Sequence, residues 1–152
     1  MPNHIIDLLT RAHQLQADDR ATGVQRMVKM ATANTLYVKN TIVGVTLSIT
    51  VDGNGWNCCD APNPNDHVID GLAPNATKSF GYCRKDGHGC NGEQGYFVLD
   101  LEGNSTNIGS IGLNMDSDGN IGITQPIPAG NKFACTVGQN EDSTYTAVLS
   151  SV

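Results

Sequence analysis

From Asn34 onward, apolar and polar residues alternate in short runs, and most runs end in glycine, proline, asparagine or aspartate. In the run VTLSITV, Val45, Leu47, Ile49 and Val51 share one face, while the residues between them share the other. A side-chain period of two is that of a β-strand. Sixteen of the seventeen glycines and five of the six prolines lie in this part of the chain. Short strands separated by such turn residues predict an antiparallel β-sandwich or barrel, and no βαβ alternation is present.

Eight runs have this character. The predicted strands are Leu36–Lys39, Val45–Val51, Thr77–Cys83, Gly95–Leu101, Ile108–Met115, Asn120–Thr124, Lys132–Val137 and Thr144–Leu149. The stretch from Ala76 to Leu101 has two alternating segments around a loop that holds Asp86, His88, Cys90 and four glycines. Because glycine adopts positive φ readily, this loop can reverse the chain, so we expect a central β-hairpin.

The first 33 residues differ from the rest. Ile5, Leu8, Leu9 and Ala12 recur at helical spacing after a capping Asn3, and a second helix is expected from the Asp18 or Asp19 cap to about residue 31. The predicted fold class is therefore mostly β, an antiparallel β-sandwich (residues 34–152) preceded by an N-terminal α-helical hairpin (residues 1–33). These helices would contact the β body, a second subunit or a membrane.

Charge excludes one class of partner. The 152 residues carry a formal net charge of −6, and the first 33 residues carry four basic and three acidic side chains, so the β body carries −7. Binding to nucleic acid requires clustered lysine and arginine, so we expect no nucleic-acid partner. No classical signal peptide or membrane span is visible, because Asp7 and Arg11 interrupt the first apolar run. The expected location is therefore cytoplasmic, or outside the cell by a non-classical route.

Five cysteines lie in the β body, and three residues around the central loop form the strongest chemical cluster. Cys83 and Cys90 could form a disulfide in an oxidising compartment, and Cys83, His88 and Cys90 could bind zinc or supply a thiol nucleophile. No Cys-x2-Cys pair exists, and proton relay normally uses partners from separate elements. We therefore expect a protein without a cofactor, a metal or catalytic residues.

Asp116–Asn120 resembles the start of a calcium loop. However, Ile121 occupies the position that requires glycine, and Ile127 occupies the position of the bidentate glutamate. The sequence instead predicts an Asp-Gly hairpin turn.

The single tryptophan, Trp56, lies in a polar, glycine-rich segment. It either covers one end of the sandwich or presents an aromatic ring that stacks on a sugar or enters a lipid interface. In the second interpretation Trp56, Tyr82 and Tyr96 are the expected ligand contacts.

The order of these features resembles the aegerolysin family of small β-sandwich proteins. The resemblance covers residues 35–123 and lies in LYVKNTIVGVTLSITV, the tryptophan that follows it, a strand ending near Cys83, and the segment Gly92–Phe97, which is similar to that family's G-x-E-G-x-F turn. It implies a lipid-recognising protein that binds particular membranes and builds pores, often with a protein partner. This chain departs from the pattern in its N-terminal arm, its cysteine-rich loops and its single tryptophan.

The sequence thus predicts a non-enzymatic binding module that recognises a lipid or membrane surface, with pore-forming, toxin-like activity as the implied extension. The first alternative is a glycan-binding or self-assembling protein that forms homo-oligomers through its N-terminal helices. The second alternative is a small thiol- or zinc-dependent enzyme.

Overall fold

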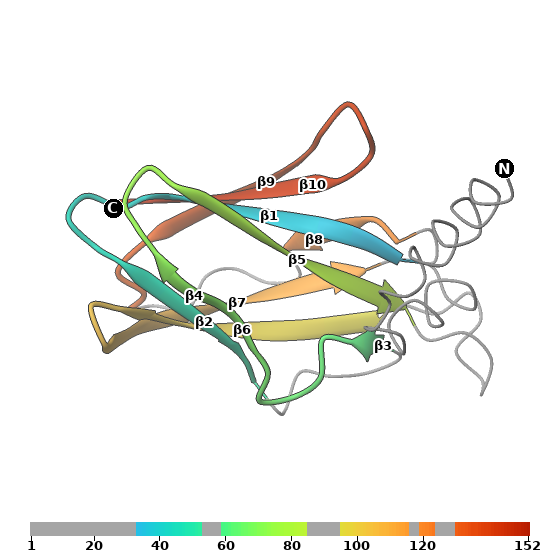
Figure 1. The fold of residues 1–152 in the computed structure, drawn as a ribbon, viewed down its shortest axis with the longest axis horizontal. Coiled ribbons are helices and arrows are strands. Elements are labelled where there is room, and N and C mark those ends of the chain that lie inside the picture. The colour runs from blue at the N-terminus through green and yellow to red at the C-terminus, as the bar shows by residue number, and fades with distance from the viewer. Residues whose placement is uncertain (1–32, 53–58, 85–94, 116–118, 124–129) are drawn as a thin grey trace, which may run out of the picture.

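A computed structural model describes residues 33–52, 59–84, 95–115, 119–123 and 130–152. This part of the chain forms ten strands in two layers (Figure 1). The strands are β1 (Ala33–Thr41), β2 (Leu47–Val51), β3 (Cys59–Ala61), β4 (His67–Leu72), β5 (Thr77–Arg84), β6 (Gly95–Gly103), β7 (Thr106–Met115), β8 (Ile121–Ile123), β9 (Ala134–Gln139) and β10 (Tyr145–Ser150).

Each layer is a five-stranded sheet. The first, sheet A, has the order β3-β5-β1-β10-β9, and the second, sheet B, has the order β4-β2-β6-β7-β8. The pairings are antiparallel except that β1 and β10 run parallel. The predicted β-sandwich is therefore confirmed, and the prediction of a purely antiparallel one is wrong at this pair.

Alternation along the strands builds the core. Leu47, Ile49 and Val51 are buried, as their shared face predicts, and Phe97, Leu99 and Leu101 of β6 are fully buried beside them. From sheet A, Phe80 and Tyr82 meet Phe97, with both pairs of ring centroids 6.2 Å apart. The two inner faces thus join in one apolar layer.

The predicted N-terminal helical hairpin is wrong as part of this fold class. The described residues form two sheets and contain no helix. Ala33, which the prediction placed in the helical arm, begins β1 and pairs with Cys83 of β5. Residues 1–32 lie outside the described residues, so the domain boundary at 33/34 stays a prediction.

The predicted central hairpin is also wrong, because β5 and β6 belong to different sheets. β5 pairs with β1 and β3, while β6 pairs with β2 and β7. The intervening residues 85–94 lie outside the described part. By contrast, the hairpin expected near Asp116–Asn120 is confirmed, since β7 and β8 pair from Met115 and Ile121 onward.

Candidate functional site

Three of the sequence-predicted site residues, Trp56, His88 and Cys90, lie outside the described residues. Tyr82 is 1 % exposed, and its hydroxyl donates a hydrogen bond of 2.8 Å to the carbonyl of Gly119. Tyr82 follows the buried Phe80 at the strand period of two, so its ring faces the core and offers no surface to a ligand, contrary to prediction. Tyr96 is half-buried on the outer face of sheet B, and stays a candidate contact.

The side chains of Cys83 and Cys135 are buried. Cys83 lies within β5 and Cys135 within β9, and burial raises the pKa of Cys135 to about 11. A thiol with such a pKa is a poor nucleophile at neutral pH. The zinc site, the thiol site and the disulfide predicted for Cys83 with His88 or Cys90 involve residues outside the described part, so they stay predictions. Among the residues that the structure describes, no cluster of His, Cys, Asp or Glu could hold a metal ion.

One end of the sandwich has an unusual surface. It includes residues 42–46 between β1 and β2, residues 73–76 between β4 and β5, and residues 103–106, which are the β6–β7 turn with the strand residue on either side of it. We call these three segments the turn end, which Figure 1 shows on the left. These thirteen positions include no charged side chain, in a protein with 24 charged residues. Transfer of these segments out of water therefore requires no desolvation of a charged side chain.

Asn40 connects two of these turns. Its side chain is completely buried, and its amide nitrogen donates to the carbonyls of Val45 at 2.7 Å and Leu72 at 3.0 Å. Its amide oxygen accepts from the backbone N–H of Ile42 at 2.9 Å. The backbone of the same residue bonds both Ala76 and Asn75. The conformation of residues 42–46 is therefore held from within the core.

Asn104 connects the third turn. Its backbone N–H donates to Thr46 O at 2.9 Å, and its side-chain oxygen accepts from Thr46 N at 3.0 Å. Its side-chain nitrogen donates to Gly44 O at 3.2 Å. The three turns are thus joined by hydrogen bonds between backbone and asparagine side chains.

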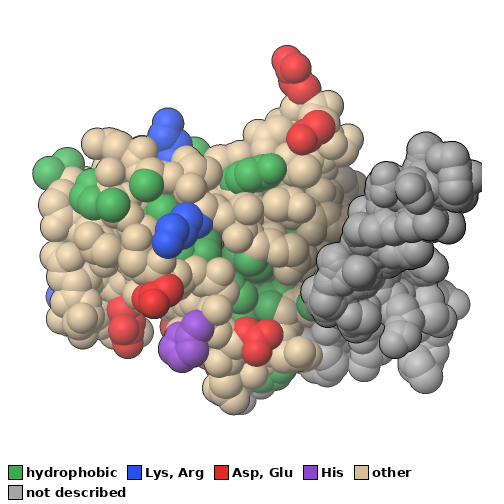
Figure 2. Space-filling view, viewed as in Figure 1, with side chains coloured by type: hydrophobic (Ala, Val, Ile, Leu, Met, Phe, Trp, Pro, Cys, Tyr) green, Lys and Arg blue, Asp and Glu red, His purple; other side chains and the backbone are tan. Residues whose placement is uncertain are grey.

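The joined turns present an apolar side chain to solvent. Val43 is 83 % exposed, and its backbone N–H donates to the Ser151 hydroxyl at 3.2 Å. Gly44 follows it with φ of +70°, a conformation that favours glycine. Val152, next to Ser151, is also exposed. Figure 2 shows hydrophobic side chains on the surface at this end of the molecule.

No protein-family model matches the chain, and no curated protein matches it. Among solved structures, the chain is similar to the RahU protein, whose crystal structure was determined in complex with a TRIS molecule. The two are 14 % identical, the alignment covers 78 % of this chain and 96 % of that chain, and the TM-score is 0.41. The aegerolysin family therefore stays a prediction from the sequence.

Charges of both signs lie on the strands that lead to the turn end. Lys39 and Lys78 are exposed on sheet A, and Asp70 and Glu102 are exposed on sheet B. The Lys78 ammonium donates to the Asp70 backbone carbonyl at 2.6 Å. Lys132 is also exposed at this end, where its backbone N–H donates to the Ile108 carbonyl, so the nearby charges are three basic and two acidic and the net charge is small.

The outer face of sheet B is more acidic. Asp100 and Asp52 approach each other there, and burial, followed by the charge of Asp52, raises the pKa of Asp100. His67 and Asp70 of β4 border this face, where His67 Nδ1 and Thr50 Oγ1 are 3.0 Å apart and the Ser48 hydroxyl donates to Asp70 at 2.9 Å. An anionic partner would be repelled from this face.

Sequence reasoning missed the turn end. It assigned no role to Val43 and placed Val45 in a strand, whereas β2 begins at Leu47. The available signal was Gly44, a turn residue between two valines. An apolar residue at the tip of a turn indicates a binding surface more specifically than an apolar residue within a strand does, because strands carry apolar residues as part of the core.

Proposed function

We propose that this chain is a non-enzymatic binding module that docks on a lipid membrane through its turn end. The observation that carries the proposal is Val43, an apolar side chain that is 83 % exposed at the tip of a turn held by the buried Asn40. Single exposed apolar residues are common on proteins. What supports a lipid contact here is the combination of that side chain with three uncharged turns that are already joined.

The energetics favour shallow, reversible contact. Moving one valine from water into an apolar environment contributes about 1.5 kcal/mol, or roughly tenfold in affinity. The exposed Ala73 and Pro74 of the neighbouring turn add apolar area. Because the asparagine hydrogen bonds order the turns before binding, little conformational entropy is lost on docking. Among the described residues, no helix is long and apolar enough to cross a bilayer.

The aegerolysin resemblance supports a further step, in which bound copies assemble into a pore, with or without a second protein. Membrane docking comes first in this scheme and does not depend on pore assembly. Release of a dye trapped in vesicles measures pore formation separately from binding.

The test is co-sedimentation with vesicles of phosphatidylcholine alone and of phosphatidylcholine with phosphatidylethanolamine, sphingomyelin or phosphatidylserine. We expect the wild-type protein to pellet with at least one mixture. Because the three turns lack charge and the charges around them nearly balance, binding should change little on addition of salt, unlike binding through a basic patch. Val43→Asp should reduce binding about tenfold or more, since a carboxylate resists transfer to the interface. Val43→Trp should strengthen it, because tryptophan favours that region.

Matched variants identify the surface that makes the contact. Gln139→Asp adds the same charge at an exposed position of β9 outside the turn end, and should leave binding unchanged. Tyr96→Ala tests the opposite end of β6, which the sequence predicted as a contact. Loss of binding in Tyr96→Ala with normal binding in Val43→Asp would reject the turn end. Absence of the wild-type protein from every lipid pellet would reject the function itself.

A further inference from the structure

The outer face of sheet A carries an open hollow of about 630 Å³ that the membrane proposal does not use. Its floor is Tyr37 of β1, which is half-buried and lies between Ser79 of β5 and Thr146 of β10 in the sheet register. Small-molecule sites commonly have volumes of about 300 to 1,000 Å³. The hollow is therefore large enough for a small ligand lying on the sheet.

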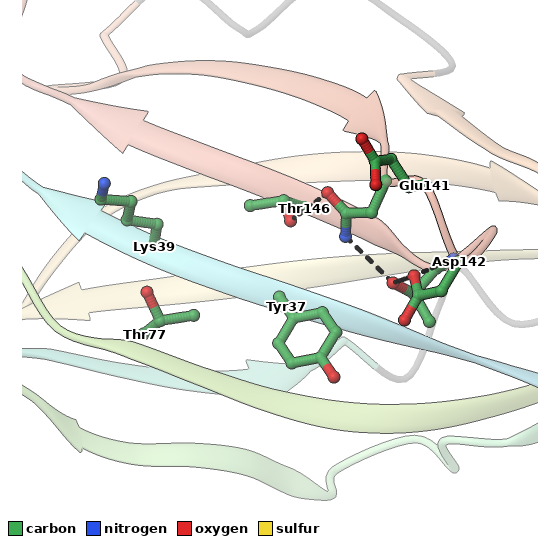
Figure 3. A pocket seen from close by; sticks show the side chains of 8 residues that line it. Tyr37, Lys39, Thr77, Glu141, Asp142 and Thr146 are labelled. Carbon is green, nitrogen blue, oxygen red and sulfur yellow. Dashed lines mark hydrogen bonds between the residues drawn. The ribbon is translucent and has the colours of Figure 1, made fainter.

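The β9–β10 turn forms one wall. Figure 3 shows Glu141 and Asp142 at one end of the hollow, Lys39 at the other, and the ring of Tyr37 on the sheet between them. Side chains from three separate strands and one turn thus line a single hollow that contains one aromatic ring.

Hydrogen bonds within the turn orient its polar groups. The Asp142 Oδ1 atom accepts from the Thr144 hydroxyl at 2.5 Å and from the Thr144 backbone N–H at 3.1 Å, and these bonds lower the pKa of Asp142. Asn140 donates to the Thr144 hydroxyl, and its amide oxygen accepts from the Thr146 hydroxyl, both at 3.0 Å. Because both bonds to Asp142 use Oδ1, the second oxygen of an ionised carboxylate remains able to accept from a ligand.

The chemistry of the lining restricts the ligand. The two carboxylates outnumber the single ammonium of Lys39, which disfavours phosphates and other anions. Quaternary ammonium groups are usually bound by several aromatic rings, and the hollow has one. A sugar ring has an apolar C–H face that packs on an aromatic ring, and a rim of hydroxyls that donate to carboxylates and accept from amide and hydroxyl groups.

We propose that this hollow is a carbohydrate-binding site for a neutral or amino sugar, with Tyr37 stacking beneath the sugar ring and Asp142 accepting hydrogen bonds from its hydroxyl or ammonium groups. This site is distinct from the turn end and does not depend on membrane docking. The sugar could belong to a free glycan or to the headgroup of a glycolipid.

The test uses free sugars, so that it is independent of lipid. Glucose, galactose, mannose, N-acetylglucosamine and glucosamine are screened by saturation-transfer difference NMR with the full chain. We expect transfer to at least one sugar, strongest at its ring C–H protons. Tyr37→Ala should weaken binding about tenfold, and Tyr37→Phe should change it by less than about threefold, because stacking uses the ring face. Asp142→Asn should weaken binding about fivefold or more, since it replaces a charged acceptor.

Thr136→Ala is the matched control, because Thr136 is exposed on the same face outside the hollow. It should bind as the wild type does. Absence of transfer to any sugar at millimolar concentration would overturn the proposal, and so would unchanged binding in both Tyr37→Ala and Asp142→Asn. Asp142→Asn keeps the proposal testable if Tyr37→Ala does not fold.

Vesicles then distinguish the two sources of the sugar. If the natural ligand is a glycolipid, addition of galactosylceramide or glucosylceramide should increase sedimentation of wild-type protein, and Tyr37→Ala should remove only that increase. If it is a free glycan, these lipids should have no effect while the free sugar binds. Vesicles without glycolipid report on the turn end alone, so failure of one proposal is distinguishable from failure of the other.

Discussion

Asn104 and Thr46 form two hydrogen bonds with each other, although 58 positions separate them in the chain. The Asn104 backbone N–H donates to the Thr46 carbonyl at 2.9 Å, and the Thr46 backbone N–H donates to the Asn104 side-chain oxygen at 3.0 Å. The pair joins the β6–β7 turn to the β1–β2 connection. It therefore couples the stability of the sandwich to the shape of the surface that carries Val43.

Replacing Asn104 should destabilise the protein. Asn104→Ala removes the acceptor for Thr46 and the donor to Gly44, and alanine adopts the φ of +51° less readily than asparagine does. We expect the free energy of unfolding to fall by about 1 to 3 kcal/mol in urea titrations. Asn104→Gly is the control, because glycine tolerates that φ but lacks the side-chain amide. Its free energy of unfolding should fall by less than that of Asn104→Ala, and this smaller fall measures the contribution of the side-chain hydrogen bonds. Equal stability of all three proteins would contradict the prediction.

Asn40 should be more critical. Asn40→Leu leaves the carbonyls of Val45 and Leu72 and the N–H of Ile42 without their side-chain partner in the core. A loss of about 3 kcal/mol or more is expected, since each buried group left unsatisfied costs about 1 kcal/mol or more. Asn63→Leu, at an exposed position, should change stability by less than about 0.5 kcal/mol. A similar small change in Asn40→Leu would show that water replaces the amide.

The acidic face of sheet B should give a pH-dependent effect. The pKa of Asp100 is raised above 3.8 by burial and by Asp52, so the folded protein disfavours the carboxylate. Its contribution to stability is present below pH 3.8 and is lost as pH rises through the folded pKa. Asp100→Asn should therefore stabilise the protein at neutral pH, by only a few tenths of a kcal/mol because solvent screens the repulsion.

Below pH 3.8 that gain should disappear. Denaturant titrations at the two pH values measure the difference. The double variant with Asp52→Asn should gain less than the sum of the single variants, because either change alone removes the repulsion. If Asp100→Asn still stabilised the protein in acid, the stabilisation would come from packing and not from removal of the charge.

Cys135 should resist alkylation in the native protein. With a pKa of about 11, about one thiol in a thousand is ionised at pH 8, and the side chain is buried as well. We expect iodoacetamide to modify Cys135 in urea and to leave it intact without denaturant, as measured by mass spectrometry of its peptide. Rapid labelling of the native protein would show that β9 opens locally.

The strands were largely predictable because their alternation is a local property. Each of the eight predicted strands overlaps an observed strand, and Leu47, Ile49 and Val51 turn inward as expected. β4 was missed because it breaks the period of two. Ile69 and Leu72 both face the core three positions apart, where the register with β2 shifts and Gly71 has φ of +63°. A bulge of this kind removes the signal by which a strand is recognised.

Sheet assignment was not predictable in the same way. Nothing local to Phe80 and Phe97 distinguishes two strands of a hairpin from two strands that cross between layers, since both give the same alternation. The parallel partner of β1 lies at the far end of the chain, beyond the reach of any periodicity argument. The exposure of Val43 depends on the asparagine hydrogen bonds that hold its turn, and those bonds exist only in the assembled sandwich.

The central place of β10 in sheet A has a consequence for synthesis. β9 joins that sheet through β10 alone, and β10 is the last of the described strands to leave the ribosome. Until then β1 has an open edge that another chain could pair with, because unpaired strand edges promote aggregation. Sheet A is therefore limited to β3, β5 and β1 until β10 is made, and a chaperone that shields the open edge of β1 should raise the yield of folded protein.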